Sequence, residues 1–180
     1  MTVLFVGARD WDHPDWQGTY FPEDLPADWR LSYYANEFST VLVDVARVLG
    51  PDGPDWEADT PESFRVVVRD DGASDVDAVA RCLGGRLGAW LLPHRNTQPG
   101  RRQALTAFAP VCSVDEAGGE CVVCRVDAGQ VLHPAVLRES LETLMDYANG
   151  VSVAYLFLEG EPPRMDNLQQ AKTVAELLGY

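Results

Sequence analysis

The sequence predicts an α/β fold in which short, mainly parallel strands alternate with helices. Apolar runs of strand length alternate along the chain with segments whose apolar residues recur with the helical period. Strand–helix–strand order repeated in this way builds right-handed βαβ units around a parallel sheet. The length of 180 residues suits one domain with one core, and no internal repeat or low-complexity tract interrupts the pattern.

Six strands are predicted from runs that are rich in apolar and β-branched residues and bounded by glycine, proline or polar residues. They cover residues 3–7, 41–45, 64–69, 88–92, 121–126 and 151–158. The segment 93–120 follows no regular pattern. Within it, residues 104–112 fit either a seventh strand or the end of a short helix, and both alternatives stay open.

Four helices are predicted between and after these strands. They cover residues 27–38, residues 75–83, a segment that begins at Pro134 and stops at Gly150, and residues 167–178. Proline suits a first helical turn because it has no N–H to donate, and glycine suits the position after a last turn. Residues 11–26 are predicted as an aromatic loop, and the proline- and glycine-rich segment 49–61 as loop or broken turn.

The charge of the chain excludes some classes of partner. Twenty-eight acidic residues against 14 basic ones give a net charge of −14. Such an acidic protein repels phosphate backbones and anionic lipids, so binding to nucleic acid or to a membrane surface is disfavoured. The longest apolar runs have strand length, and no basic segment precedes the first one, so we expect a cytoplasmic protein.

Four cysteines, Cys82, Cys112, Cys121 and Cys124, are expected to be reduced thiols in such a compartment. Cys121 and Cys124 form a C-x-x-C motif, which suggests a redox or zinc site. The motif lies in a predicted strand, however, where residues three apart point to opposite faces. No second C-x-x-C and no histidine pair accompanies it, so the sequence predicts neither a metal nor a cofactor.

The N-terminal residues carry a specific resemblance. An opening segment has glycine, aromatic and proline residues at fixed positions: Gly7, Trp11, Trp16, Gly18, Tyr20, Phe21 and Pro22. The second half of the first predicted helix and the start of the next strand follow, with Tyr34, Ala35, Phe38 and Val41. This pattern closely resembles the opening of the YecE-like proteins, the family called domain of unknown function 72. Three later segments are similar to family segments as well: Thr60, Pro61 and Phe64; Leu87 and Gly88; and the helix that starts at Asn167 and ends at Gly179.

The resemblance implies a TIM-type (β/α) barrel with its site at the carboxyl ends of the strands. The chain is about 70 residues shorter than a typical barrel of about 250 residues, and the missing length falls mainly within residues 93–120. The expected fold is therefore an incomplete or shortened (β/α) barrel. It has about six to seven mainly parallel strands with outer helices and forms a single domain over residues 1–180. The resemblance also implies that the aromatic loop belongs to the framework of the fold.

Several polar positions of the family pattern have changed in this chain. Asp44 stands where the second strand of the family ends in asparagine, and Arg69 replaces a lysine at the third strand. His94 falls in the changed motif of the fourth strand, and Arg125 and Asp127 fall in that of the seventh. The resemblance is to a family without a settled biochemical activity, and the loss of the family's other polar residues implies that any chemistry is lost. We therefore expect a non-catalytic protein.

Two interpretations of the remaining strand-end residues stay open. In the first, Arg69 and Arg125 converge on a small anion such as phosphate or a carboxylate, while Asp44, Asp127 and His94 position them. In the second, which we favour, Arg69 pairs with Asp44 and Arg125 with Asp127, because charges that leave water must find partners.

Other polar residues lie close to these strand ends in the sequence, namely Arg9, Asp10, His13 and Glu159. The alternative function is a hydrolase or phosphoryl-handling enzyme that uses the strand-end histidine and arginine residues. A protein-binding role at the same strand ends is also open.

The sequence also predicts a homodimer. A deletion in the middle of a barrel leaves the strands near Leu91 and Val123 without their usual neighbours. Either residues 104–112 add a local strand that closes a smaller sheet, or a second copy of the chain covers the gap. We expect a dimer interface that includes residues 93–120.

Overall fold

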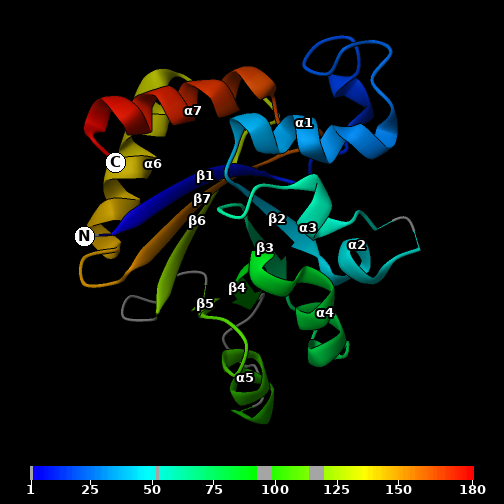
Figure 1. Ribbon diagram of the computed structural model, residues 1–180. Coiled ribbons are helices and arrows are strands. Elements are labelled where there is room, and N and C mark those ends of the chain that lie inside the picture. The colour runs from blue at the N-terminus through cyan, green and yellow to red at the C-terminus, as the bar shows by residue number, and fades with distance from the viewer. Residues whose placement is uncertain (1, 52, 93–98, 114–119) are drawn as a thin grey trace.

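The computed structural model describes residues 2–51, 53–92, 99–113 and 120–180. Within these residues seven strands form one sheet in which all neighbouring strands are parallel, in the order β5-β4-β3-β2-β1-β7-β6 (Figure 1). The strands are β1 (Val3–Arg9), β2 (Thr40–Asp44), β3 (Arg65–Arg69), β4 (Leu87–Leu92), β5 (Val111–Ser113), β6 (Cys121–Asp127) and β7 (Val153–Glu159). The sheet curls into a nearly closed barrel, which confirms the expected shortened TIM-type fold.

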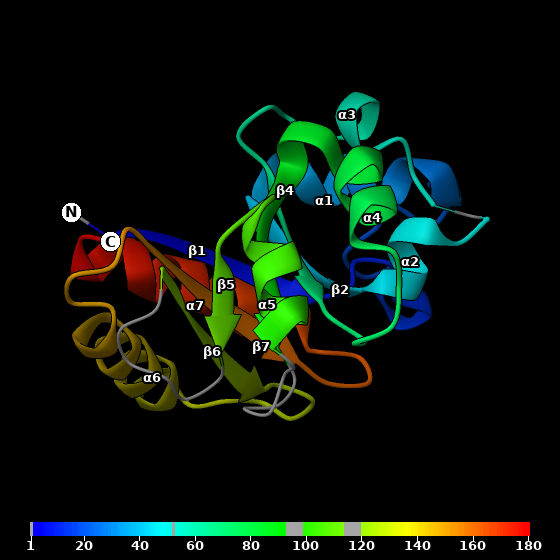
Figure 2. The same ribbon diagram turned by 90° about the horizontal axis from the view of Figure 1, so that it is seen from below.

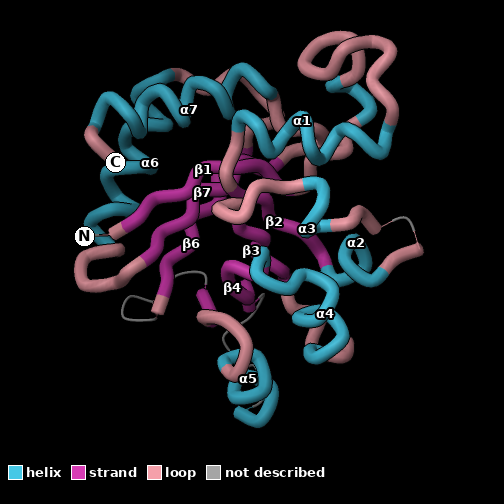
Figure 3. Tube along the Cα trace, viewed as in Figure 1, coloured by secondary structure: helices cyan, strands magenta, loops and turns pink. Residues whose placement is uncertain are grey.

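Helices surround the outside of this barrel, as the cyan segments around the magenta strands show in Figure 3. The α-helices are α1 (Arg30–Glu37), α2 (Val45–Leu49), α3 (Trp56–Asp59), α4 (Val76–Leu83), α5 (Pro99–Thr106), α6 (Pro134–Tyr147) and α7 (Met165–Leu178). Three short 3₁₀ turns accompany them: η1 (Pro14–Trp16), η2 (Ala27–Trp29) and η3 (Gly84–Arg86). None of the helices in the described residues has the length and apolar character needed to cross a membrane.

Alternation along the strands divides the core into two apolar layers. Side chains that point to one face of the sheet fill the barrel: Phe5, Leu42, Val67, Ala89, Leu91, Cys112, Cys121, Val123, Val153, Tyr155 and Phe157. Side chains of the opposite face pack against the helices, with Trp90 and Phe64 among the fully buried ones. Gly7 is the inward residue of β1 between Phe5 and Arg9. A Cβ atom there would lie 2.2 Å from the Thr40 carbonyl oxygen, so β1 and β2 require glycine at this point.

The two edge strands β5 and β6 meet at the seam of the barrel. They lie side by side in Figure 2, and in the described residues no backbone ladder joins them. A disulfide between Cys112 and Cys121 crosses the seam, with the two Cα atoms 5.2 Å apart. Reduced thiols were therefore the wrong expectation for these two cysteines, because the closing of the barrel brings them together inside it. Cys82 and Cys124 are free, and Cys124 contacts the helix-side layer, which confirms that the C-x-x-C residues face opposite ways.

Most predicted elements match the structure within two or three residues, with differences in three places. The short helix α2 over Val45–Leu49 was not predicted, and Val45 was assigned to the strand before it. Residues 104–112 hold both predicted alternatives, because α5 ends at Thr106 and β5 begins at Val111. The loop predicted over residues 49–61 contains the helical turn α3, which was missed. The carboxylate of Asp55 accepts the backbone N–H of Ala58 at 3.1 Å, and Trp56 is buried, so a cap and one large side chain stabilise a turn amid prolines and glycines.

Candidate functional site

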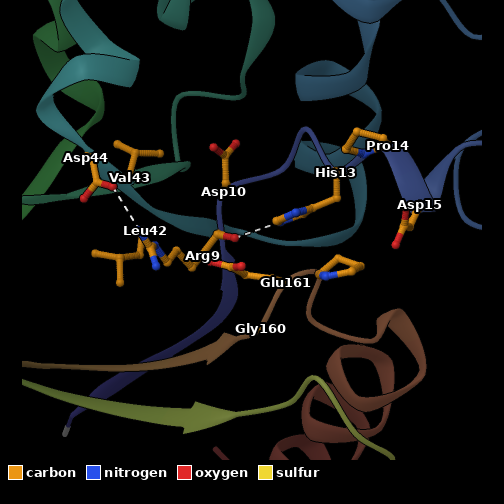
Figure 4. A pocket seen from close by; sticks show the side chains of 11 residues that line it. Arg9, Asp10, His13, Pro14, Asp15, Leu42, Val43, Asp44, Gly160 and Glu161 are labelled. Atoms are coloured by element: carbon orange, nitrogen blue, oxygen red, sulfur yellow. Dashed lines mark hydrogen bonds and ion pairs between the residues drawn. The ribbon is translucent and has the colours of Figure 1, made fainter.

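A cavity of about 390 Å³ opens at the carboxyl ends of β1, β2 and β7. One wall is the end of β1 with Arg9 and the segment after it with His13. A second wall is the end of β2, and a third is the turn after β7 with Gly160 and Glu161 (Figure 4). Because all strands are parallel, their last inward residues gather at this same end of the barrel. In (β/α) barrels this end is the one that carries the functional residues.

One carboxylate at this end is shared by two arginines. Oδ2 of Asp44 accepts a hydrogen bond from Nη2 of Arg9 at 3.1 Å, and Oδ1 of Asp44 lies 2.6 Å from Nε of Arg69. Asp44 and Arg69 are direct neighbours in the β2–β3 register, which explains their contact. All three side chains are about one-third to two-fifths exposed, at 37% for Arg9, 41% for Asp44 and 32% for Arg69. Two guanidinium groups around one carboxylate leave an excess of one positive charge.

Each of these arginines keeps donors to spare. A guanidinium group has five N–H donors in a planar fork. Among the described residues, acceptors reach only Nη2 of Arg9 and only Nε of Arg69. The remaining nitrogens are open to solvent or to a ligand. The arrangement can therefore bind a further carboxylate or phosphate group without breaking the existing pairs.

His13 lines the same cavity with a fixed orientation. Its Nε2 lies 2.9 Å from the carbonyl oxygen of Arg9. A carbonyl oxygen only accepts, so Nε2 carries the proton that it donates. The ring also packs edge-on against Trp16, with the centroids 4.5 Å apart. In the described part of the chain no partner contacts Nδ1, which leaves that nitrogen free to accept a proton.

Asp10 turns the chain from β1 into the aromatic loop. Its backbone lies in the left-handed region at φ 59°, which residues other than glycine rarely adopt. Hydrogen bonds to its own side chain offset the cost of this conformation: Oδ1 of Asp10 accepts hydrogen bonds from the backbone N–H groups of Trp11 at 2.7 Å and Asp12 at 3.2 Å. The same oxygen lies 3.5 Å from Nε of Arg47. In Figure 4 its carboxylate points away from Arg9. Backbone strain of this kind concentrates at functional sites, where the surroundings hold it in place.

A second charged cluster supports the loop from behind. Asp12 accepts hydrogen bonds from Arg30 and, at 3.0 Å, from Nη2 of Arg47. Burial raises the pKa of Asp12, but the hydrogen bonds and charges of Arg30 and Arg47 outweigh it and hold the pKa below its usual value. The guanidinium carbon of Arg47 lies 4.4 Å from the ring centroid of Trp11, and both Trp11 and Trp16 are buried. The aromatic loop is thus part of the framework, as the family resemblance implied.

The strand ends of β6 and β7 form the other side of the mouth. Nη1 of Arg125 lies 3.4 Å from Oε1 of Glu159, and Oδ1 of Asp127 accepts the backbone N–H of Gly129 at 3.1 Å. The expected pair of Arg125 with Asp127 is therefore wrong, because both residues are on one strand and Glu159 of the neighbouring strand is the nearer partner. The pairing predicted for Arg69 and Asp44 is present. His94 lies outside the described residues, so the structure places four of the five predicted residues.

Sequence reasoning missed Asp15, Gly160 and Glu161 as cavity residues. Glu161 and Gly160 follow β7 directly, and the rule that strand ends converge could have identified them. Asp15 lies in the turn η1, and no sequence signal marks it. In the described ranges, no cluster of three or more histidine, cysteine or acidic side chains is arranged to hold a metal ion.

Comparisons with known proteins agree with this picture. The family model described as "Protein of unknown function DUF72" matches residues 5–70. A DUF72 family protein from Thermotoga maritima has a similar structure, with a TM-score of 0.64, 15% identity, and coverage of 98% of this chain and 99% of that one. A DUF72 family protein from Enterococcus faecalis aligns with a TM-score of 0.57 at 14% identity, over 97% of this chain and 96% of that one. No curated protein sequence matches the chain.

Proposed function

We propose that this chain, which matches the DUF72 family model over residues 5–70 and resembles DUF72 proteins in fold, is a binding protein. In this proposal it takes up a small organic anion at the mouth of its shortened barrel and catalyses no reaction. The observation that carries the proposal is the sharing of Asp44 between Arg9 and Arg69. That cluster has one positive charge in excess and several unoccupied N–H donors. A carboxylate or phosphate group supplies the missing negative charge and the missing acceptors.

Three of the predicted site residues take different parts in this proposal. Arg69 lies beside the cavity that Arg9 and Asp44 line, where it adds positive charge for an anion, and Asp44 holds it beside Arg9. Arg125 has its own acidic partner, Glu159, and no excess charge, so its contribution to anion binding is smaller. Arg9 takes the role that was predicted for Arg125, because it lines the cavity and shares Asp44 with Arg69.

The experiment is a series of thermal melts with sulfate, phosphate and succinate. An anion that binds only the folded protein raises the melting temperature by mass action. We expect that rise for the natural protein, its loss in Arg9→Ala and Arg69→Ala, and its partial retention in Arg125→Ala. The control is Arg138→Ala, which removes an exposed arginine of α6. A melting temperature that responds to none of the anions contradicts the proposal.

A second candidate function, a hydrolase or phosphoryl-handling enzyme, is supported by the orientation of His13. The Arg9 carbonyl fixes its tautomer and leaves Nδ1 as a base beside a cavity that also contains Arg9. Hydrolysis of p-nitrophenyl acetate and p-nitrophenyl phosphate, measured between pH 5 and 9, tests this function. A rate that rises with deprotonation of a histidine and disappears in His13→Gln supports it, and rates equal to those of buffer contradict it.

A homodimer is also part of the proposal. The edges of the sheet, β5 and β6, approach each other at the seam without a backbone ladder in the described residues, so each retains unpaired backbone groups there. We propose that a second copy contacts this region, including residues 93–120. Light scattering at micromolar concentration should give twice the 19.8 kDa chain mass. The monomer mass at both low and high salt contradicts the dimer.

A further inference from the structure

The charges around the cavity are separated into a positive and a negative part. We infer that the ligand is a small zwitterion, an amino acid or another aminocarboxylate. Its carboxylate lies against Arg9, and its ammonium group lies against Asp15 and Glu161. This inference rests on the anion site proposed above, and it adds the chemical class of the ligand.

Four carboxylates line the cavity, and their surroundings divide them into two pairs. Asp10 is held by two backbone N–H groups and Arg47, and Asp44 is held by two arginines. Their negative charge is already compensated inside the protein. Asp15 and Glu161 also line the cavity, and no cation of the described residues pairs with either side chain. These two carboxylates are therefore the ones that remain for a ligand.

The two uncompensated acids come from different elements than the arginine cluster. Asp15 belongs to the turn η1 and Glu161 to the turn after β7, whereas Arg9 and Asp44 end β1 and β2. Figure 4 shows Asp44 at one end of the cavity and Asp15 at the other, with His13 and Glu161 between them. A ligand in this cavity thus meets an excess positive charge at one end and unpaired carboxylates toward the other. Molecules with one charge of each sign fit that pattern.

The overall charge of the protein favours the same class of ligand. A net charge of −14 produces a negative potential that repels free anions and lowers their local concentration. A zwitterion has no net charge, so this potential does not repel it, and its carboxylate is still available to Arg9. Its ammonium group gains from Asp15 and Glu161, whereas a second carboxylate in the same place is repelled.

The size and apolar lining limit the ligand further. The volume of about 390 Å³ is near the lower end for cavities that bind small molecules. Leu42, Val43, Pro14 and Pro162 supply apolar surface between the charged groups. This surface suits the methylene groups of an amino acid or a dipeptide better than a strongly hydrated inorganic ion.

The test compares ligands that have the same number of carbon atoms and different charged groups at their ends. Succinate has two carboxylates, 4-aminobutyrate one carboxylate and one ammonium group, and 1,4-diaminobutane two ammonium groups, all on a four-carbon chain. The corresponding six-carbon compounds are adipate, 6-aminohexanoate and 1,6-diaminohexane. Calorimetric titration of the full chain gives the affinities. We expect the aminocarboxylate to bind more tightly than the dicarboxylate of equal length, with the diamine weakest.

Two variants assign the ammonium contacts. Glu161→Gln should weaken the aminocarboxylate about threefold, as removal of a partly exposed ion pair does, and should strengthen succinate. Asp15→Asn should act in the same direction. The control is Glu139→Gln on α6, which makes the same change of charge at an exposed position outside the cavity and should leave every affinity unchanged. Circular dichroism verifies that each variant is folded.

The outcomes separate this inference from the function on which it rests. Equal or tighter binding of the dicarboxylate, insensitive to Glu161→Gln, overturns the zwitterion and leaves the anion site in place. Tightest binding of the diamine overturns both. Absence of binding by all six compounds, together with melting temperatures that no anion raises, also overturns both.

Discussion

The two sides of the barrel mouth use the same types of residue and reach opposite charges. On the side of β1, β2 and β3, two arginines share Asp44. On the side of β6 and β7, Arg125 pairs with Glu159, while Asp127 accepts the backbone N–H of Gly129 and pairs with no cation of the described residues. The first cluster therefore has an excess positive charge and the second an excess negative one. The types of residue are the same in both clusters. The clusters differ in how many arginines share each acidic side chain, and that number sets the sign of the excess charge.

The two sides also differ in how they are supported. The first is backed by the aromatic loop and by the cluster of Asp12, Arg30 and Arg47, and its elements fall within the residues that match the family model. Asp70, which directly follows β3 on this first side, is only 2% exposed and forms an ion pair with Arg101 of α5. The second side is supported by close backbone contact, in which Ala128 donates to the Glu159 carbonyl at 2.6 Å. Rigid support of the first side is what a preorganised binding site requires.

The largest expected effect comes from the buried pair beside the first side. Nη2 of Arg101 lies 2.5 Å from Oδ1 of Asp70, and its Nε lies 3.2 Å from the same oxygen. Asp70→Ala removes the buried carboxylate and leaves Arg101 with the exposed Asp71, 3.9 Å away, as its nearest acid, so we expect a loss of about 3 kcal/mol of unfolding free energy in urea titrations. Glu159→Gln on the second side should cost below about 1 kcal/mol, because that pair is partly exposed. Equal losses of unfolding free energy in Asp70→Ala and Glu159→Gln would contradict the view that the first side is more strongly supported than the second.

The disulfide at the seam should have the next largest effect. It closes a short loop, since Cys112 and Cys121 are nine residues apart, and a bridge of that length stabilises a protein by about 2–3 kcal/mol. A Cys112→Ser/Cys121→Ser variant should lose that amount in urea titrations, and Cys82→Ser, at an exposed free cysteine, should lose almost nothing. Titration of thiols in the denatured, non-reduced protein gives an independent measure. Four thiols per chain instead of two would show that the bridge is absent.

The fold could be predicted from the sequence because its signals are local. Alternating apolar runs located six strands. The start signal at Pro134 and the stop signal at Gly150 located a helix that the structure places at Pro134–Tyr147. The turn α3 was missed because proline and glycine around it concealed one aspartate cap and one buried tryptophan. The disulfide was missed because it depends on the curvature that brings β5 to β6, and no local pattern records that curvature.

The candidate site could be predicted only in part. Parallel strands bring their last residues to one end, so Asp44, Arg69, Arg125 and Asp127 were located correctly at strand ends. The ion-pair partners of these residues could not all be predicted, because pairing depends on the register between neighbouring strands. Asp44 and Arg69 are level in the ladder, whereas Arg125 is level with Phe157 and finds Glu159 one inward position further along β7. Glu161 follows the end of β7, so the convergence of strand ends could have identified it as well, whereas no sequence signal marks Asp15.

Acid should weaken the first side of the mouth through Asp12. The charges and hydrogen bonds of Arg30 and Arg47 hold its pKa below the usual value, against the opposing effect of burial. A lowered pKa in the folded state contributes stability above the unfolded pKa of about 3.9, and this stability is lost as the pH falls through the lower, folded value. Urea titrations from pH 7 to pH 2 should therefore show a steeper acid loss for the natural protein than for Asp12→Asn. Parallel curves would contradict this role.

The last prediction concerns Asp44→Asn, which should change the stability least and should distinguish the two sides most clearly by their affinity for sulfate. Asp44→Asn removes the carboxylate that Arg9 and Arg69 share, but all three side chains are partly exposed, so the cost should stay below about 1 kcal/mol. The same change frees two guanidinium groups and doubles the excess positive charge, so sulfate should bind several-fold more tightly in calorimetric titrations. Glu159→Gln frees only Arg125, with Asp127 still nearby, and should leave sulfate affinity almost unchanged. If Glu159→Gln strengthens sulfate binding as much as Asp44→Asn does, the two sides are equivalent and the anion site does not lie at β1, β2 and β3.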